Sequence, residues 1–238
     1  MRVSPVLSGL LAATTLLLAG CTSWPSITLH PSSVSSPDQN GSPEQNGPSS
    51  PALEALDRLP VIRWADLAQG YQRADFGNSW LDTDGNGCNQ RDDVLLRDAL
   101  PDRELVVTTQ GGCDHDVLAG TWLDPYTGQE LTFTDLKDRT QSQAIQIDHV
   151  VSLSDAWATG AWAWTPQERI EFANDLDNLL AVDGPTNQAK SDQGPPFWLP
   201  EVNRCRYVEH YVRVKDAYGL GVSVDAVAGL RRLLEECV

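Results

Sequence analysis

The sequence has few basic residues and no apolar segment long enough to span a membrane. Its 33 Asp and Glu residues outnumber its 17 Lys and Arg residues, which gives the 238-residue chain a formal net charge of −16. This charge argues against long-range attraction of the protein to nucleic acid or to an anionic membrane. The longest apolar run, Val6–Gly20, is shorter than the about 20 residues that a stable transmembrane helix needs.

The sequence also lacks any Cys-x-x-Cys pair, which disfavours a zinc site built from thiolates. Apolar residues are plentiful, however: they make up 41% of the chain, with 8 Trp, and only 21% of the residues are charged. A chain of this composition can bury a hydrophobic core, so a wholly disordered protein is excluded.

The N-terminal segment has the three parts of a secretory signal. A short basic start at Arg2 is followed by an apolar stretch, and small residues precede Cys21. The ending Leu18-Ala19-Gly20-Cys21 resembles the lipobox of bacterial lipoproteins. We therefore expect residues 1–20 to be a signal peptide and Cys21 to be lipidated, which would anchor the exported protein on the extracellular face of the membrane. The alternative is an ordinary signal peptide with a cysteine nearby.

The other four cysteines form an even set in an exported, oxidising environment, where disulfides persist. Four cysteines allow three pairings. We expect the local pairing, Cys88–Cys113 and Cys205–Cys237, because the first bond closes a short loop and the second ties together the last two predicted helices. The two crossed pairings are the alternatives.

A segment rich in serine and proline follows the signal. Residues 22–50 contain 9 Ser and 5 Pro, and they include no Lys or Arg. Such a segment cannot bury enough apolar surface to order itself. We therefore expect residues 21–50 to form a flexible tether and residues 51–238 to form the folded domain.

The hydrophobic patterns in residues 51–238 mix helices and strands without a repeating strand–helix–strand unit, which predicts an α+β fold. We expect helices over residues 92–100, 204–218 and 224–236, and strands over residues 104–109, 130–134, 145–147 and 178–182. Thr165-Pro166-Gln167-Glu168 has the pattern of a capping box with proline in the first turn, so a helix should begin there. Gly184-Pro185-Thr186 turns the chain into a helix that carries Asn187 and Lys190.

Polar residues suited to metal-assisted hydrolysis accompany one of the four histidines. Asp148 precedes His149, and Asn178 and Asn187 follow it along the chain. Carboxylate and amide oxygens are ligands that Mg²⁺ prefers, and a neutral imidazole can take a proton from an attacking water. Because Asp148 and His149 are neighbours at the end of a predicted strand, their side chains should diverge, one toward a metal and the other toward the water.

The spacing of these residues resembles the HNH, or ββα-metal, nuclease motif in its His-Asn-Asn form. The resemblance rests on Asp148-His149-Val150-Val151, Asn178-Leu179-Leu180-Ala181 and Asn187-Gln188-Ala189-Lys190. The wider frame is similar to exported actinobacterial HNH proteins related to the C-terminal domain of GmrSD-type restriction endonucleases. That frame includes Tyr71-Gln72-Arg73-Ala74-Asp75-Phe76, Trp80-Leu81-Asp82, Asp124-Pro125-Tyr126-Thr127-Gly128 and Ser154-Asp155-Ala156-Trp157.

The resemblance implies a ββα-metal core, here with added helices and a disulfide-tied C-terminal helix pair. Asp148 and Asn187 would bind a divalent cation, for which we expect Mg²⁺, with Mn²⁺ or Ca²⁺ as alternatives. His149 would be the general base, and Asn178 would hydrogen-bond the loop backbone and hold the His149 strand in place. Lys190 would contact a phosphate or lie exposed on its helix.

The function implied by the resemblance is an extracellular, lipid-anchored, metal-dependent endonuclease that hydrolyses phosphodiester bonds of DNA, with RNA as a second substrate class. A bound cation would supply the positive charge that the acidic chain lacks. We expect a monomer that has nucleic acid as its partner and is held at the membrane through Cys21. The alternative is a non-catalytic cell-surface lipoprotein that uses a decayed nuclease fold for binding, which the acidic charge favours.

The sequence departs from the fuller HNH pattern at two points. Asn187 stands where many members have a last histidine, and an amide oxygen fits a hard cation better than it fits Zn²⁺. A long insert, residues 150–177, separates His149 from Asn178. The insert carries three tryptophans that could lie in the core or form a wall facing the substrate, and we favour the core: Trp157, Trp162 and Trp164.

Two further segments are candidates for metal binding. Asp82-Thr83-Asp84-Gly85-Asn86-Gly87 has oxygen ligands at alternate positions, like the opening of a calcium loop, but Asp93 occupies the twelfth position, where such loops carry a bidentate Glu. For this segment we favour a polar turn ahead of Cys88. The other segment is Cys113-Asp114-His115-Asp116, where we favour a surface loop beside a disulfide.

Overall fold

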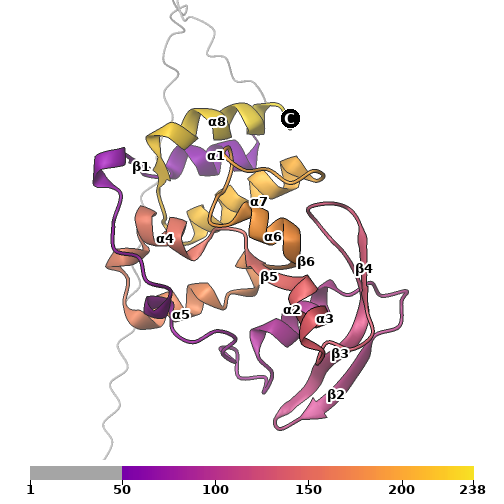
Figure 1. Cartoon of the computed structure of the whole chain (residues 1–238). Helices are drawn as coiled ribbons and strands as arrows, with labels where there is room; N and C mark the ends of the chain where they lie inside the picture. The colour runs from indigo at the N-terminus through magenta and orange to yellow at the C-terminus, as the bar shows by residue number, and fades with distance from the viewer. Residues whose placement is uncertain (1–49) are drawn as a thin grey trace, which may run out of the picture. The chain divides into compact units, whose positions relative to one another are not determined.

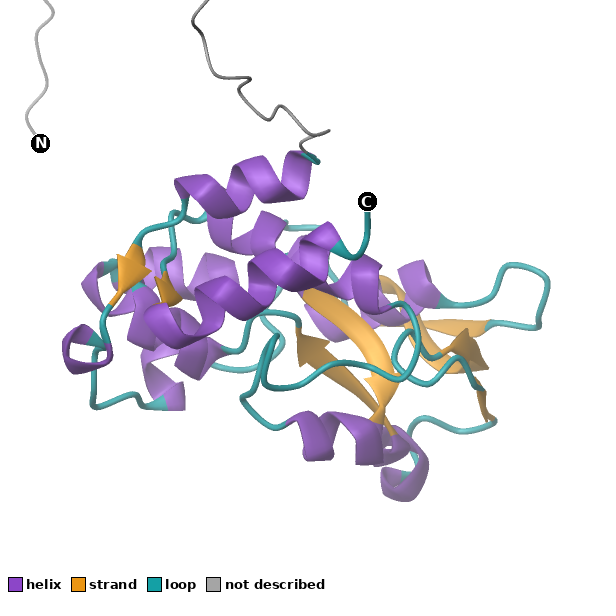
Figure 2. Cartoon of the chain, turned by 90° about the horizontal axis from the view of Figure 1, so that it is seen from above, coloured by secondary structure: helices purple, strands orange, loops and turns teal. Residues whose placement is uncertain are grey.

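The structure, a computed structural model, describes residues 50–238 (Figures 1 and 2). The expected signal peptide, the expected lipidation site Cys21 and the expected tether up to residue 49 lie outside the described residues. Among the helices of the described part, none is long and apolar enough to cross a membrane.

Helices and strands are mixed along the described residues, which confirms the α+β class. The helices are α1 Pro51–Arg58, α2 Gln90–Asp98, α3 Arg139–Ala144, α4 Leu153–Thr159, α5 Pro166–Ala173, α6 Gly184–Lys190, α7 Arg204–Ala217 and α8 Val224–Glu235. The strands are β1 Val61–Ile62, β2 Val106–Gln110, β3 Cys113–Leu123, β4 Glu130–Phe133, β5 Ile145–His149, β6 Leu179–Asp183 and β7 Val222–Ser223. The expected elements are present within two residues of their expected bounds, whereas β1, β3, β7, α1, α3 and α4 were not predicted.

The strands of the described residues form three small sheets (Figure 1). β2, β3 and β4 form an antiparallel sheet, β5 pairs with β6 in antiparallel orientation, and the short strands β1 and β7 pair in parallel. Because β3 begins at Cys113, the surface loop expected over residues 113–116 is wrong. Asp116 is buried there, and its carboxylate accepts a hydrogen bond from Lys137 Nζ at 2.7 Å. Lys137 lies 21 residues after Asp116 in the sequence, and its ammonium compensates the buried charge. The residues around Asp116 therefore do not by themselves predict that it is buried.

β5, β6 and α6 form a strand–strand–helix unit that carries most of the polar residues singled out above. β5 and β6 pair from Ile145 opposite Asp183 to His149 opposite Leu179. The connection between the two strands contains α4 and α5, so a helical insertion joins them instead of a tight turn. α6 begins directly after β6, where the Asp183 carboxylate accepts a hydrogen bond from the Thr186 N–H as the helix N-cap. The start of α6 is thereby fixed relative to the strand pair.

Two clusters of buried apolar side chains hold this unit within the described part of the chain. The larger cluster joins α1, α4, α5, α7 and α8, and α1 and α8 lie side by side although they are far apart in sequence (Figures 1 and 2). The smaller cluster packs α2 and β3 against the strand pair, with Trp122 fully buried. Val182 belongs to the larger cluster and Ile145 to the smaller one. The β5–β6 pair is therefore packed by both clusters.

The insert between β5 and β6 follows the expectations in part. Trp157 and Trp164 pack against the larger cluster, whereas Trp162 is 57% exposed, so its expected core position is wrong. Trp162 lies on a single 3-10 turn between α4 and α5, which is too short to bury every side chain that it carries. The expected capping box is present, because the side chains of Thr165 and Glu168 each accept a hydrogen bond from the other residue's N–H.

Both expected disulfides are present. Cys88–Cys113 joins the start of α2 to the first residue of β3, and Cys205–Cys237 joins the first turn of α7 to the chain just after α8. The local pairing is thus confirmed over the crossed alternatives, and so is the disulfide-tied pair of C-terminal helices. Two disulfides in one chain are typical of an exported protein.

Candidate active site

The end of β5 and one face of α6 line a cleft of about 550 Å³. Asp148 and His149 end β5, Asn187 lies on α6, and all three line the cleft together with Gln146. The structure therefore brings together three residues that the sequence analysis predicted. Asn178 and Lys190 are fully buried behind them.

Asp148 is buried, and both of its carboxylate oxygens accept hydrogen bonds. Tyr126 Oη donates to Oδ2 at 2.6 Å, and Lys190 Nζ donates to Oδ1 at 3.0 Å. Burial raises the pKa of Asp148, and the ammonium of Lys190 and the hydroxyl of Tyr126 oppose this rise. Asp124 Oδ1 accepts a hydrogen bond from the Asp183 N–H at 3.1 Å, which ties the turn that carries Tyr126 to the end of β6. The turn thereby holds the Tyr126 hydroxyl against Asp148.

Lys190 is fully buried. Both expectations for it, contact with a phosphate and exposure on the helix, are therefore wrong. Its ammonium donates to Asp148 Oδ1 and to the backbone oxygen of His149, each at 3.0 Å. Lys190 ends α6, and this last turn packs onto β5, so the side chain lies beneath the end of the strand. Its charge therefore forms a buried ion pair with Asp148.

His149 is a buried histidine with one ring nitrogen engaged. Its Nε2 lies 2.8 Å from the backbone oxygen of Ala173, which can only accept a hydrogen bond. We therefore assign the ring proton to Nε2 and leave Nδ1 as the acceptor. Burial lowers the pKa of His149 to about 4; the hydrogen bond to Ala173 opposes this shift, and the charges of Arg73 and Lys190 add to it. The ring is neutral near neutral pH.

We predict that burial of His149 makes the protein less stable as the pH falls from about 6.5 to about 4. In this window the unfolded chain binds a proton at His149 that the folded chain does not, so the free energy of unfolding decreases with falling pH. The full shift corresponds to about 3 kcal/mol. Urea unfolding of the parent and of a His149→Gln variant should show that the variant lacks this part of the pH dependence.

The raised pKa of Asp148 acts in the opposite sense, because the folded state then binds a proton more readily than the unfolded chain. Both proteins in this comparison contain Asp148, so its contribution largely cancels in their difference. An identical pH dependence in the parent and in the variant would show that His149 is not held neutral by the fold.

Asn178 makes the backbone contacts that the sequence analysis expected of it. Its Oδ1 accepts a hydrogen bond from the Val151 N–H at 2.9 Å, and its Nδ2 donates to the Val151 oxygen at 3.2 Å. The Val150 N–H donates to the backbone oxygen of Asn178 at 2.9 Å. Asn178 thus ties the two residues after His149 to the start of β6.

Oxygen donors gather on the α6 side of the cleft. Asn187 Nδ2 donates to Gln146 Oε1 at 3.0 Å, and Gln146 lies two residues before Asp148, on the same face of β5. With Nδ2 engaged, the ligand that Asn187 offers is its amide oxygen. A carboxylate and two amides are hard donors that suit Mg²⁺, Mn²⁺ or Ca²⁺. The donor set fits a hard divalent cation, although Lys190 competes for the charge of Asp148.

Comparison with known protein families matches residues 90–222 to the C-terminal domain of GmrSD restriction endonucleases. This match covers more than half of the chain, from the start of α2 to β7. The chain belongs to this family. It is also 37% identical over 194 residues to a protein of Arthroderma benhamiae described as an uncharacterized secreted protein, a match that covers 80% of this chain and 87% of the relative. No solved structure matches the chain.

Three residues of the site were given no role in the sequence analysis, although Arg73 and Tyr126 lie within the segments of the family resemblance: Arg73, Tyr126 and Gln146. The GmrSD C-terminal domain match includes the turn with Tyr126 but begins after Arg73. Arg73 is exposed, and among the described residues that line the cleft it is the one with a permanent positive charge. Alternation along the predicted strand could have found Gln146, whereas Arg73 and Tyr126 reach the site only through tertiary contacts.

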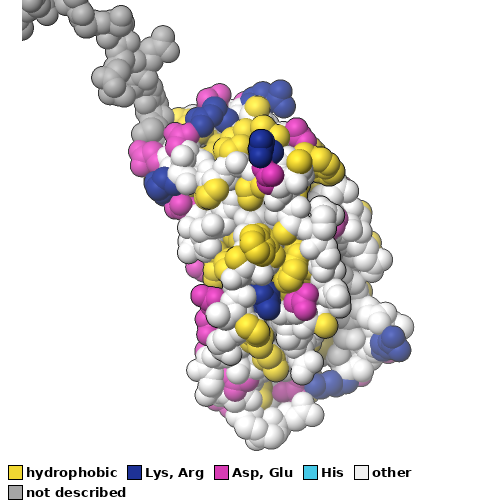
Figure 3. Space-filling view, turned by 90° about the vertical axis from the view of Figure 1, so that its left-hand side faces the viewer, with side chains coloured by type: hydrophobic (Ala, Val, Ile, Leu, Met, Phe, Trp, Pro, Cys, Tyr) yellow, Lys and Arg dark blue, Asp and Glu magenta, His cyan; other side chains and the backbone are white. Residues whose placement is uncertain are grey.

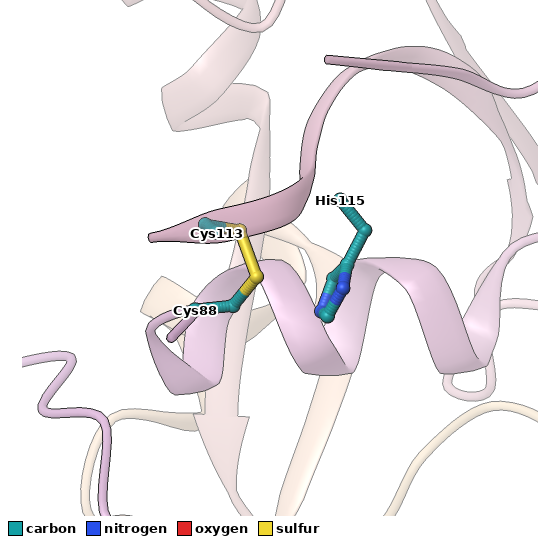
Figure 4. Close-up of side chains that lie close together, drawn as sticks. All are labelled: Cys88, Cys113 and His115. Carbon is teal, nitrogen blue, oxygen red and sulfur yellow. A yellow bond between two sulfur atoms is a disulfide. The ribbon is translucent and has the colours of Figure 1, made fainter. Parts of the chain in front are cut away.

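A second group of potential metal ligands lies away from the cleft. Within the described residues it consists of Cys88, Cys113 and His115 (Figure 4). The two sulfurs are bonded to each other, so neither is a thiolate that could bind a metal. His115 Nε2 lies 2.7 Å from Asp93 Oδ1, and Nδ1 lies 2.6 Å from Asp114 Oδ1. This group is therefore a disulfide beside a histidine that is already paired with carboxylates.

Proposed function

We propose that the protein is an exported, metal-dependent endonuclease of the HNH type, in which β5, β6 and α6 form a ββα-metal core. The observation that carries the proposal is a neutral His149 in one cleft with Asp148 and Asn187. Membership of the GmrSD C-terminal domain family supports an endonuclease. The two disulfides and the secreted relative support export.

His149 supplies the base that hydrolysis of a phosphodiester requires. Its Nδ1 takes a proton from the attacking water, because Nε2 is committed to the Ala173 oxygen. The low pKa of His149 keeps the ring in its basic form before substrate binds. The negative charge of a bound phosphodiester then raises the pKa of the ring and favours the imidazolium that forms. Asn178 keeps the chain after His149 in place during this transfer.

Asp148 and Asn187 would hold the divalent cation, for which we propose Mg²⁺, with Mn²⁺ or Ca²⁺ as substitutes. When bound, the cation stabilises the charge that develops on the scissile phosphate and on the leaving oxygen. Lys190 neutralises part of the Asp148 charge, so we expect weaker binding of the cation than at a carboxylate free of ion pairs.

The surface charge bears on how a substrate reaches this cleft. On the face drawn in Figure 3, Lys and Arg side chains are interspersed with acidic and apolar ones and form no continuous stripe. The net charge of −16 likewise slows association with a polyanion. Arg73 in the cleft is therefore the side chain that we propose for the first contact with the phosphate backbone of DNA or RNA.

We predict that Arg73→Ala raises KM more than it lowers kcat, because the exposed guanidinium contacts a phosphate next to the scissile bond. One phosphate contact fewer should also reduce the slope of log affinity against log salt by about 1. Affinity for a short duplex across a salt series measures this slope. Arg63, which is exposed and pairs with Asp66 at 2.7 Å outside the cleft, provides the control variant Arg63→Ala. Equal slopes for the parent and Arg73→Ala would refute the phosphate contact.

The second candidate function is a non-catalytic cell-surface binding protein built on a decayed nuclease fold, which the net charge of −16 favours. Plasmid cleavage by the purified chain separates the two candidates. We expect nicked and linear DNA in the presence of Mg²⁺ or Mn²⁺ and intact plasmid after addition of EDTA. Plasmid that stays intact with each of Mg²⁺, Mn²⁺ and Ca²⁺ would refute the proposal that the protein is an enzyme.

We further propose that residues 1–20 are removed on export, that Cys21 carries the lipid anchor, and that residues 51–238 act as one monomeric domain at the end of the tether. The support is the sequence pattern Leu18-Ala19-Gly20-Cys21. Cys21→Ser should release the protein from the membrane or leave it as precursor, since the lipid carries most of the membrane affinity. Mature-length Cys21→Ser protein in the membrane fraction would exclude the anchor.

A further inference from the structure

We propose that the loop from Asp82 to Asp93 binds a calcium ion, at a site separate from the cleft of the candidate active site. The sequence allows two interpretations of this loop, a polar turn or the opening of a calcium loop. The structure favours the second, because it folds Asp93 back toward the loop and leaves one of its buried oxygens without a partner.

Asp93 lies in the first turn of α2 and is 8% exposed. Its Oδ1 accepts a hydrogen bond from Asn86 Nδ2 at 3.0 Å, so the carboxylate faces the loop. Its Oδ2 is the one buried side-chain oxygen or nitrogen without a hydrogen-bond partner among the described residues. A buried carboxylate oxygen without a donor costs free energy, and a cation that reaches it removes this cost.

The loop presents further oxygens at the spacing that calcium loops use. Counted from Asp82, the residues Asp84, Asn86 and Asp93 occupy positions three, five and twelve. The two carboxylate oxygens of Asp82 accept hydrogen bonds from the N–H groups of residues 85 and 87, at 2.7 and 2.9 Å, which turn this carboxylate over the loop. Gly87, at position six, has φ +93°, and a Cβ there would lie 2.4 Å from the backbone oxygen of residue 112. Only glycine fits this turn.

Asn86 lies between two carboxylates. Its Nδ2 donates to Asp84 Oδ2 at 3.2 Å and to Asp93 Oδ1 at 3.0 Å. An amide nitrogen and an amide oxygen have nearly the same size, so rotation of the Asn86 side chain about its terminal bond exchanges the two, with loss of the hydrogen bond that Oδ1 accepts from the Cys88 N–H at 2.7 Å. After this rotation, oxygens alone would face the space between Asp84 and Asp93, as a calcium ligand set requires.

The negative charge of the loop would favour binding of a cation. Asp82, Asp84 and Asp93 bring three carboxylates together, and among the ion pairs of the described residues only His115 engages one of them, Asp93. His115 also contacts Asp114, so the positive charge that it carries when protonated is shared between two carboxylates. Ca²⁺ accepts six to eight oxygens in flexible geometry, whereas Mg²⁺ demands a near-octahedral set. A loop that must rearrange one amide suits Ca²⁺ better.

The loop borders the candidate active site, so an ion bound there would order part of its wall. Trp80, two residues before Asp82, lines the cleft beside His149. On the other side of the loop, Arg97 of α2 donates to the backbone oxygen of Leu179 in β6 at 2.6 Å. A calcium ion would fix the Trp80 segment to α2 and, through α2, to the strand pair.

Titration of the purified full chain with CaCl₂, by calorimetry and by thermal unfolding, tests the site. We expect a dissociation constant of about 10⁻⁴–10⁻³ M, as for extracellular calcium modules. A rise of several degrees in the melting temperature should accompany saturation, with a smaller effect of MgCl₂. Asp84→Asn and Asp93→Asn should each weaken Ca²⁺ binding by at least about tenfold, because each removes one charged ligand.

Two control variants locate the ion. Asp57→Asn removes an exposed carboxylate of α1 that pairs with Arg231 away from the loop, and it should leave the affinity for Ca²⁺ unchanged. Asn187→Ala alters the cleft and should likewise retain the calcium-dependent rise in melting temperature. If Asp93→Asn does not fold, the exposed Asp84 carries the test through Asp84→Asn. An affinity for Ca²⁺ that is unchanged in Asp84→Asn, a calcium-dependent rise in melting temperature that disappears in Asn187→Ala, or undetectable binding in the parent overturns the proposal.

Discussion

Replacement of His149 by alanine should lower turnover by about 10²–10⁴-fold, the typical cost of a missing general base, while divalent-cation affinity stays nearly unchanged. The imidazole contacts the Ala173 oxygen, and its neighbour Asp148 points to the opposite face of β5, toward Lys190. Loss of the ring therefore removes the proton acceptor without removing a cation ligand. The measurement is the cleavage rate at saturating metal, with calorimetric metal affinity for the same protein.

His210 provides a matched control for this substitution. Its Nε2 also contacts a backbone oxygen, that of Asp177, and burial lowers the pKa of His210 as it does that of His149. His210 is not among the residues that line the cleft, so His210→Ala should leave turnover within a few-fold of the parent. An equal loss in both variants would point to a general effect on folding instead of a missing base.

The cation ligands should respond in the opposite way. Asp148→Ala and Asn187→Ala each remove an oxygen donor, so metal affinity should fall, and excess metal should partly rescue Asn187→Ala. Asn178→Ala should be intermediate, because it loosens the chain that follows His149 without touching base or ligand. If His149→Ala abolishes metal binding while Asp148→Ala leaves it intact, the proposed roles are reversed.

The part of this site that the sequence predicts is the part that local patterns determine. Alternation at Ile145 and Ile147 predicts β5, and the run from Asn178 to residue 182 predicts β6, because strand periodicity is a property of adjacent residues. Pro185 and the N-cap Asp183 likewise determine where α6 begins. The order strand, strand, helix and the polar residues at its ends therefore follow from short segments.

What the sequence did not predict depends on contacts between distant segments. Tyr126 reaches Asp148 across the turn after β3, and Arg73 reaches the cleft from a 3-10 turn that precedes the family match. β3 was not predicted because Asp116 interrupts the apolar pattern of the strand. Asp116 can be buried there because Lys137 pairs with it. Lys190 was misplaced for the same reason, since helical periodicity cannot show that a charged side chain has a buried partner.

Lys190→Met is expected to destabilise the protein by about 3–5 kcal/mol, because it leaves the buried Asp148 carboxylate without its counter-ion. The pKa of Asp148 should rise further, so the stability deficit relative to the parent should shrink as the pH falls and this carboxyl group binds a proton. The double variant Asp148→Asn/Lys190→Met removes both charges and should recover most of the loss, since a buried ion pair and a neutral pair of similar volume differ little in stability. Urea unfolding of the parent, both single variants and the double variant measures the coupling.

Lys215→Met is the control that distinguishes the effect of losing the Lys190–Asp148 ion pair from the effect of removing any buried lysine. Lys215 is also fully buried, with its Nζ 2.9 Å from Asp155 Oδ2, but Asp155 is only partly buried and neither residue lines the cleft. Lys215→Met should therefore destabilise the protein without altering cation affinity, whereas Lys190→Met should tighten cation binding by the folded protein, because it removes the ammonium that competes with the cation for Asp148. If Lys190→Met instead binds nucleic acid more weakly and its stability is unchanged, Lys190 contacts a phosphate and the proposed ion-pair role is wrong.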